Sequence, residues 1–250
     1  MGALTGKVAV VTGAAQGVGR CHAELLAAEG AAVVVNDLSP NIDEVAAAIR
    51  GAGGKAVAHK GSVSDWAQAE ALVARAVSEF GDLHILVNNA GFIRDAMSFS
   101  MEEAQFDSVV EVHMKGHFAP AHFAAVHWRN AAKQLGEEGA LPARRIINTT
   151  SESGLFGGPG QGNYGSAKGG IITMTMVLAR ELARYNVTVN CIAPRARTPM
   201  TEVNPKCRQG SIVRWSPVRH AGVGRPADVR YPNFRVRGLR RRRRAPHPAR

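Results

Sequence analysis

Short apolar runs alternate with longer amphipathic stretches along the first 194 residues. The runs are apolar at successive positions, which is typical of strands buried on both faces of a sheet. Strands are predicted at 7–12, 32–36, 56–59, 84–88, 145–149 and 187–192. The stretches between them repeat with a helical period and predict helices at 17–29, 42–50, 65–80, 101–126 and 164–185, with 101–126 as either one helix or two.

Strands that alternate with helices indicate a parallel sheet, because parallel neighbours must be joined by a crossover connection. Right-handed crossovers then build a doubly wound, Rossmann-like α/β fold with helices on both faces of the sheet. Such a sheet binds ligands at the carboxyl ends of its strands, so we expect a site in the loops after the first, fourth, fifth and sixth strands. The segment from Trp128 to Arg144 is polar and contains glycine, and we expect a surface loop there.

Both patterns disappear after about residue 202. Residues 195–250 carry 16 Lys and Arg against 2 Asp and Glu, whereas residues 1–194 carry 15 against 18, so the net charge of +11 comes from the C-terminal end. Prolines recur there, and five arginines stand in a row at 240–244. We therefore predict a folded domain over 1–201 and an irregular, basic tail of disordered composition over 202–250. A shifted reading frame joined to a shortened domain is one hypothesis for so abrupt a change.

Composition argues against several classes of protein. Hydrophobic residues make up 45% and charged residues 20% of the 250 residues, which is typical of a globular chain. No apolar run approaches about 18 residues, so no membrane span is expected, and the absence of a secretion signal favours a cytoplasmic location. The three cysteines, Cys21, Cys191 and Cys207, are far apart and unpaired in motif, which argues against a disulfide framework and a zinc site.

A glycine-rich turn follows the first predicted strand. Its glycines would allow a tight turn and let a pyrophosphate approach the start of the next helix. A plain strand-to-helix turn is the alternative, but the position within a strand–helix–strand unit favours a dinucleotide. The residues expected at the cofactor here are Gly13, Gln16, Gly17, Val18 and Gly19.

Asp37 ends the second predicted strand, 18 residues after Gly19. A carboxylate at that place accepts hydrogen bonds from the adenine-ribose hydroxyls and repels a 2′-phosphate. Its neighbour Leu38 is apolar, and no basic residue stands close by. The pattern predicts NAD and makes NADP the less favoured cofactor, with an ordinary turn carboxylate as the alternative.

Tyr164 and Lys168 stand four residues apart at the start of a predicted helix, so their side chains share one face. A phenol has a pKa of about 10, and a nearby ammonium would lower that pKa toward the range of a useful general acid or base. Ser151 follows the fifth predicted strand, and its hydroxyl could bind a substrate carbonyl or alcohol oxygen.

These features together resemble the short-chain dehydrogenase/reductase family, nearest to its hydroxyacyl-CoA, hydroxysteroid and 3-oxoacyl reductase members. The resemblance covers about residues 4–201. The matching motifs are Thr12-Gly13-x-x-x-Gly17-x-Gly19, Asn88-Asn89-Ala90-Gly91, Ser151, Tyr164-x-x-x-Lys168 and Val189-Asn190-Cys191-Ile192-Ala193-Pro194.

The resemblance implies a role for each motif. Tyr164 would be the general acid/base, Lys168 would lower its pKa and hold the nicotinamide ribose, and Ser151 would orient the substrate oxygen. The further cofactor contacts that it implies, beside Tyr164 and Lys168, are Asn89, Ala90, Gly91, Pro194 and Thr198.

The sequence departs from the family pattern at several places. His113 stands where the family often has an asparagine of a proton relay, and a histidine can also relay a proton; a packed helix histidine is the alternative. His113 and His117 have no evident third partner, so no metal is expected. Ser62 replaces the usual aspartate beside the adenine, and the adenine contact would then fall to Val63. The seventh strand of the family is not legible, so we expect the sheet to lack it.

The resemblance predicts an NAD-dependent oxidoreductase that interconverts a secondary alcohol and a ketone, on a 3-hydroxyacyl-CoA or steroid-like small molecule. It also implies a homo-oligomer. Two alternatives stay open at this point. One is a catalytically weak remnant that binds the cofactor, and the other is polyanion binding through the arginine-rich tail. Polyarginine binds without sequence selectivity, so no specific nucleic-acid partner is expected.

Overall fold

The structure is a computed structural model that describes residues 2–135, 141–194 and 196. These residues all belong to one compact unit, which spans 1–213. The predicted tail lies outside the described residues, as do Thr198 and Cys207. After the sixth strand, the structure describes only residues 193, 194 and 196.

Six parallel strands form one sheet in the order β3-β2-β1-β4-β5-β6. This order confirms the predicted doubly wound α/β fold, and each predicted strand is found within a residue or two of its expected place. The strands are β1 (Val8–Thr12), β2 (Ala32–Asp37), β3 (Lys55–Lys60), β4 (Ile85–Asn88), β5 (Arg144–Thr149) and β6 (Val187–Ile192). Among the described residues, β6 lies at one edge of the sheet.

Helices connect the strands, as predicted. They are α1 (Gly17–Ala28), α2 (Ile42–Gly51), α3 (Trp66–Phe80), α4 (Glu103–Val110), α5 (Gly116–Leu135), α6 (Ser153–Phe156) and α7 (Gly162–Leu182). A π-helical turn, Glu111–Lys115, joins α4 to α5, and a 3-10 turn, Ala183–Tyr185, follows α7. The predicted 101–126 helix is therefore two helices with a distorted turn between them. The short α6 was not predicted, because four residues show no helical period.

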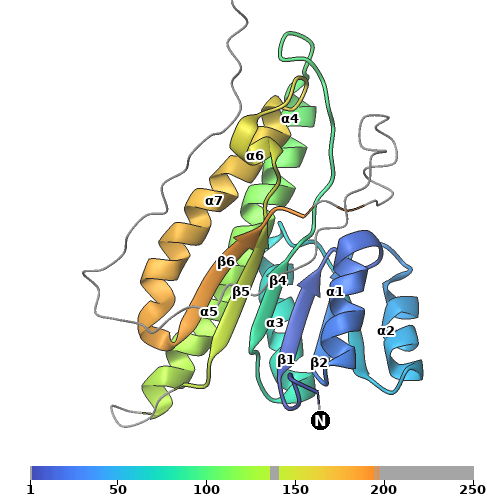
Figure 1. The fold of residues 1–250 in the computed structure, drawn as a ribbon, viewed down its shortest axis with the longest axis vertical. Coiled ribbons are helices and arrows are strands. Elements are labelled where there is room, and N and C mark those ends of the chain that lie inside the picture. The colour runs from blue at the N-terminus through green and yellow to red at the C-terminus, as the bar shows by residue number, and fades with distance from the viewer. Residues whose placement is uncertain (1, 136–140, 195, 197–250) are drawn as a thin grey trace, which may run out of the picture. The chain divides into compact units, whose positions relative to one another are not determined.

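Helices cover both faces of the sheet (Figure 1). An apolar core lies on each face. In β1, Val8 and Val10 face the core shared with α3, α5 and α7, whereas Ala9 and Val11 face the core shared with α1 and α2. All five residues of β1 are buried. A strand covered on both faces needs apolar side chains at every position, which explains the continuous apolar runs in the sequence.

The chain reverses its direction of progress across the sheet between β1 and β4, which are direct neighbours. At such a switch point the loops at the carboxyl ends of the two strands run apart and leave a crevice. Among the described helices, none combines the length and apolar content that crossing a bilayer requires.

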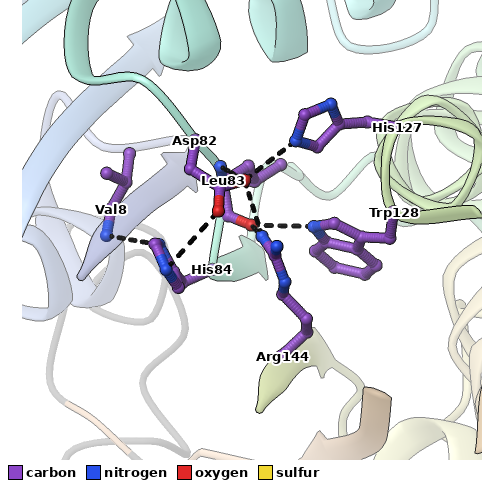
Figure 2. A network of polar contacts seen from close by, with 7 residues as sticks. All are labelled: Val8, Asp82, Leu83, His84, His127, Trp128 and Arg144. Atoms are coloured by element: carbon purple, nitrogen blue, oxygen red, sulfur yellow. Dashed lines mark hydrogen bonds and ion pairs between the residues drawn. The ribbon is translucent and has the colours of Figure 1, made fainter. Parts of the chain in front are cut away.

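The prediction of a surface loop from Trp128 to Arg144 is wrong at both ends. Helix α5 continues to Leu135, and the side chains of Trp128 and Arg144 are both almost fully buried. The Trp128 indole Nε1 donates a hydrogen bond to the carbonyl of Leu83 over 2.7 Å, and the Arg144 guanidinium donates to the same carbonyl (Figure 2). The polar tips of both side chains find partners inside the protein, so polarity in the sequence did not mean exposure.

Asp82 is the charged partner of Arg144 in this buried network. Arg144 Nη1 donates to Asp82 Oδ1 over 2.7 Å, and His127 Nε2 lies 2.9 Å from the same oxygen (Figure 2). Burial raises the pKa of Asp82, but the hydrogen bonds from Arg144 and His127 outweigh burial and lower the pKa to about 2. The network lies at the amino-terminal ends of β4 and β5, at the opposite end of the sheet from the crevice.

Candidate active site

A cavity of about 370 Å³ opens at the carboxyl ends of the strands. It is lined by loops that follow several strands and by the first turns of α7. Nearly all described residues that the sequence assigned to a site meet there. Those residues are Gly13, Gln16, Gly17, Val18, Asp37, Ser62, Val63, Asn89, Ala90, Gly91, His113, Ser151, Tyr164, Lys168 and Pro194.

Gly19 does not line the cavity but packs beneath the glycine turn. A Cβ atom on Gly19 would lie 2.2 Å from the Gly13 carbonyl oxygen and 2.5 Å from Asn89 Nδ2. Gly13 itself adopts φ +64°, and a Cβ there would lie 2.7 Å from the Ala90 Cα. Both glycines therefore let the turn after β1 pack directly on the segment after β4.

Thr12 and Asn89 hold these two segments together. The Thr12 hydroxyl accepts hydrogen bonds from the backbone N–H groups of Asn89 (2.9 Å) and Ala90 (3.1 Å). In return, Asn89 Nδ2 donates to the carbonyls of Thr12 and Gly13. Thr12 belonged to the glycine motif in the sequence, but its part in supporting the Asn89 segment could be found only from the pairing of β1 with β4.

Asp37 lies at the end of β2, beside the glycine turn. Its carboxylate accepts a hydrogen bond from the N–H of Ala15 and another from the N–H of Ser39, both of 3.0 Å. These bonds fix the carboxylate at the rim of the cavity, next to the exposed side chain of Leu38. Each carboxylate oxygen keeps a further lone pair, so two more donors, such as a pair of hydroxyls, could bind.

The start of α1 faces the same cavity. Gly17 and Val18, the first residues of the helix, line it, and Gln16 makes no side-chain cap to the first N–H groups. No acidic residue stands in the first turn. A helix start of this kind attracts an anion, because its N–H groups and the helix dipole both favour negative charge. The residues thus fit a dinucleotide, with a pyrophosphate at α1 and a ribose at Asp37.

Ser62 and Val63 lie at the far side of this region, after β3. The N–H of Ser62 donates to Gln68 Oε1 over 2.6 Å, and its hydroxyl lies 3.1 Å from that of Ser64. The side chain of Val63 is buried and packs closely on Gly116 at the start of α5. These contacts fix the loop that the sequence assigned to the adenine.

Tyr164, Lys168 and Ser151 converge at the opposite end of the cavity. The Lys168 ammonium is buried and donates to the carbonyl of Thr149 over 2.7 Å, and it lies 5.6 Å from the centre of the Tyr164 ring. The Ser151 side chain acts on the Tyr164 phenol as a hydrogen-bonding neighbour that lowers its pKa. Because Ser151 follows β5 and the other two lie on α7, the packing of β5 against α7 determines this arrangement.

The expected lowering of the Tyr164 pKa by Lys168 is not found in the structure. Burial raises the pKa of Tyr164 above its ordinary value, and the hydrogen bond with Ser151 offsets only part of that effect. Burial also lowers the pKa of Lys168 to about 7, so this ammonium is easily deprotonated at neutral pH. The sequence predicted that the two side chains are neighbours. It could not predict how deeply the fold buries them, and burial sets both pKa values.

His113 lies in the π-helical turn and touches Tyr164. Its ring meets the Tyr164 ring edge-on, with centroids 5.1 Å apart, and its Nε2 is 2.7 Å from the Phe92 carbonyl oxygen. Burial, with the nearby charge of Lys168, lowers the pKa of His113 to about 3. Its role as a proton relay stays a prediction, and such a relay would have to use the neutral tautomers of the ring.

His117 lies one turn further along α5 and is fully buried. Its ring centre is 6.4 Å from that of His113, and burial lowers its pKa well below the ordinary value. Within the described ranges, no group of three or more His, Cys, Asp or Glu side chains is arranged to hold a metal ion. His117 is thus enclosed in the protein interior, whereas His113 lines the cavity.

The chain is similar to known proteins in family pattern, in sequence and in structure. The sequence pattern of the short chain dehydrogenase family matches residues 7–209 of the chain. A solved short chain dehydrogenase from Mycobacterium avium is 49% identical, with a TM-score of 0.75. The match covers 80% of this chain and 71% of that structure.

Three relatives represent the similar sequences. Hydroxyacyl-CoA dehydrogenase ChsB1 of Mycobacterium tuberculosis is 50% identical over 204 residues, which are 79% of this chain and 63% of the relative. The peroxisomal hydratase-dehydrogenase-epimerase of Saccharomyces cerevisiae is 41% identical over 78% of this chain and 22% of its own length. The 3-oxoacyl-[acyl-carrier-protein] reductase FabG of Thermotoga maritima is 36% identical over 90% of this chain and 88% of the relative. The chain thus spans less than two thirds of the first two relatives.

Proposed function

Since the chain belongs to the short-chain dehydrogenase family, we propose that it is an NAD-dependent oxidoreductase that interconverts a secondary alcohol and a ketone. One observation carries the proposal. The Ser151–Tyr164 hydroxyl pair and the buried Lys168 line the same cavity as Asp37 and the open start of α1. A dinucleotide and a small hydroxylated substrate could therefore occupy neighbouring places in one site.

The chain's own residues supply binding and proton transfer. The hydroxyls of Ser151 and Tyr164 would both bind the substrate oxygen, and Tyr164 would take its proton during oxidation or return it during reduction. Lys168 would hold a ribose hydroxyl while it stays anchored to the carbonyl of Thr149. When bound, the dinucleotide supplies the carbon that accepts or donates the hydride.

A 3-hydroxyacyl-CoA is the substrate class that we propose. Relatives named as hydroxyacyl-CoA dehydrogenase and 3-oxoacyl-[acyl-carrier-protein] reductase support it, because the names describe oxidation of a hydroxyacyl-CoA and reduction of a 3-oxoacyl group. Helix α6, which follows Ser151 directly, exposes the apolar side chains of Leu155 and Phe156. Apolar surface beside the reacting hydroxyls suits an acyl chain.

The test is direct. The purified chain is mixed with NAD and a panel of 3-hydroxyacyl-CoA thioesters, with steroid alcohols and simple secondary alcohols as comparison, and reduced nicotinamide is followed by absorbance. We expect turnover with the thioesters. Dinucleotide binding without turnover of any alcohol would contradict the proposal and favour the cofactor-binding remnant that the sequence left open.

Cofactor choice gives a second prediction. Replacing Asp37 with serine should weaken NAD binding by about 10- to 150-fold, since it removes charged hydrogen bonds worth about 1.5–3 kcal/mol. The same change removes the repulsion of a 2′-phosphate, so use of NADP should rise. The ratio of kcat/KM for the two cofactors measures the effect. Asp43→Ser on α2 serves as the matched control, and an unchanged ratio in Asp37→Ser would contradict the NAD assignment.

The pH dependence gives a third prediction. Because the pKa of Tyr164 is raised, its phenolate is a minor form at neutral pH, while the protonated phenol dominates. Oxidation needs the phenolate, so its kcat/KM should rise about tenfold per pH unit below that pKa, whereas reduction should be fastest at neutral or lower pH. Rate profiles in both directions measure this, and oxidation that is independent of pH from about 7 to 9 would contradict it.

Three sequence predictions go with this proposal. They are a cytoplasmic location, a homo-oligomeric state and a small-molecule alcohol or ketone as the only partner besides the dinucleotide. All three stay predictions. The basic tail that suggested polyanion binding lies outside the described residues.

A further inference from the structure

The segment after Phe92 is attached to the start of α7 by several hydrogen bonds. The N–H of Ala96 donates to the Gly160 carbonyl over 2.9 Å, and Ala96 forms an isolated parallel bridge with Gln161. Asn163 Nδ2 donates to the Arg94 carbonyl over 2.9 Å. These bonds join residues 94–96 to residues 160–163, close in sequence to Phe92 and Tyr164, which both line the cavity.

A chain of side-chain hydrogen bonds links these two segments and reaches Ser151. Gln161 Nε2 donates to Asp95 Oδ2 over 3.1 Å, and Gln161 Oε1 accepts from the Ser153 hydroxyl over 2.7 Å. The N–H of Ser153 then donates to Ser151 Oγ over 3.2 Å. We call Asp95, Gln161 and Ser153 the latch.

We propose that the latch positions the Ser151 hydroxyl for the reaction, with Gln161 as the positioning residue that joins the substrate-side segment to the catalytic loop. This inference rests on the proposed function of the site. None of the three side chains is expected to touch the reacting atoms, so they act through Ser151.

The chemistry of each group explains which partner donates and which accepts in this series of hydrogen bonds. A hydroxyl has one proton to donate and two lone pairs. The Ser153 N–H occupies one lone pair of Ser151 Oγ, which leaves the hydroxyl of Ser151 for Tyr164 and a substrate oxygen. The Ser153 loop is held in turn because its own hydroxyl is bound by the amide oxygen of Gln161. An amide is the group that can accept from Ser153 and donate to the Asp95 carboxylate at the same time.

The charge of Asp95 also reaches the general acid/base. Four side chains act on Tyr164. Lys168 lies near its ring, Ser151 lowers its pKa by hydrogen bonding, and His113 is neutral. The Asp95 carboxylate raises the pKa of the phenol. Removal of that charge should therefore move the rate profile for oxidation to lower pH. This shift reports the charge of Asp95, whereas the hydrogen bonds of the latch are tested by changing Gln161.

The experiment uses Gln161→Glu. A protonated carboxyl at position 161 can accept from Ser153 and donate to Asp95, as the amide does, whereas an ionised one faces Asp95 with like charge. We expect a loss of about 10- to 100-fold in kcat/KM at about pH 8, where the new carboxylate is ionised, and a smaller loss toward about pH 5, as it becomes protonated, beyond any change in the wild type. The KM for NAD should not change, because the latch lies at the substrate end. Gln134→Glu, at an exposed site on α5, is the matched control.

A second variant completes the test. In Asp95→Asn/Gln161→Glu the new amide can donate to the ionised carboxyl, so activity at about pH 8 should recover. Asp95→Asn alone keeps the acceptor for Gln161, and it should remain active with its oxidation profile displaced to lower pH. Asp107→Asn, on the exposed surface of α4, controls for the loss of one negative charge.

Two results would overturn the inference. One is a Gln161→Glu enzyme with the wild-type pH profile, and the other is a double variant that fails to recover although its thermal unfolding matches that of the wild type. Wild-type turnover, measured in parallel, tests the proposed function separately. If the wild type turns over no alcohol, ultraviolet titration of the Tyr164 phenol replaces the rate profile, with Tyr164→Phe as the blank. An unchanged Tyr164 pKa in Asp95→Asn would then contradict the latch.

Discussion

Replacing Tyr164 with phenylalanine should lower kcat by about 100- to 10,000-fold while it leaves the affinity for NAD nearly unchanged. The phenol is the one group in the described cavity that is placed to exchange a proton with a substrate oxygen beside Ser151. Phenylalanine keeps the ring that packs edge-on against His113 and removes only the oxygen. The loss should therefore appear in the proton-transfer step and not in the folding of the site.

Stopped-flow and steady-state measurement of reduced nicotinamide gives kcat, and fluorescence titration gives the affinity for NAD. Tyr185→Phe is the matched control, because Tyr185 lies in the 3-10 turn after α7, outside the cavity residues. Oxidation that continued at the wild-type rate in Tyr164→Phe would exclude the phenol as the general acid/base. A loss of NAD affinity as large as the loss of kcat would assign Tyr164 a binding role instead.

The sequence was sufficient to predict the place of most site residues. Each lies in a loop that follows a buried apolar strand, and the carboxyl ends of parallel strands meet at one edge of the sheet. Gly13, Asp37 and Ser151 come from three such loops, so their meeting follows from the strand–helix alternation alone. Tyr164 and Lys168 share a face because they are four residues apart on α7.

The ionisation of the site could not be predicted in the same way. The pKa of a side chain depends on how much water the surrounding fold excludes, which spacing along the chain does not reveal. Lys168 and Tyr164 are close together as expected. Burial, however, lowers the pKa of Lys168 and raises the pKa of Tyr164, which favours the neutral form of each group. The latch was missed for a related reason, since Asp95 and Gln161 meet only through the packing of two irregular loops.

Arg144 shows how a polarity pattern misleads when a charge is buried with its partner. Its charge suggested a loop, but the guanidinium is enclosed by Asp82, the Leu83 carbonyl and the face of Trp128. Such an arrangement is invisible in the sequence, because Asp82 and Arg144 are 62 positions apart. The structure therefore predicts a stability effect at a residue that the sequence assigned to the surface.

Replacing Arg144 with leucine should lower the free energy of unfolding by about 1.5–3 kcal/mol, because it removes the hydrogen bonds of a buried guanidinium to the partly exposed Asp82 carboxylate and to the Leu83 carbonyl. The variant would leave the Asp82 carboxylate with His127, His84 and the Leu83 N–H as partners, and the Leu83 carbonyl with one donor fewer. Denaturant unfolding followed by circular dichroism measures the loss. Arg145→Leu is the matched control. Arg145 is the next residue in β5, and its side chain is exposed on the opposite face of the strand.

The pH dependence of that loss distinguishes a broken ion pair from a simple packing defect. The pKa of Asp82 is lowered from 3.8 to about 2 in the folded protein, so its ionised form stabilises the fold above about pH 4. That stabilisation disappears as the pH falls toward 2, when the carboxyl becomes protonated in the folded state as well. The difference between wild type and Arg144→Leu should therefore shrink over this range. A difference that stayed constant down to pH 2 would mean that the guanidinium acts through packing alone, and the electrostatic account of this network would be wrong.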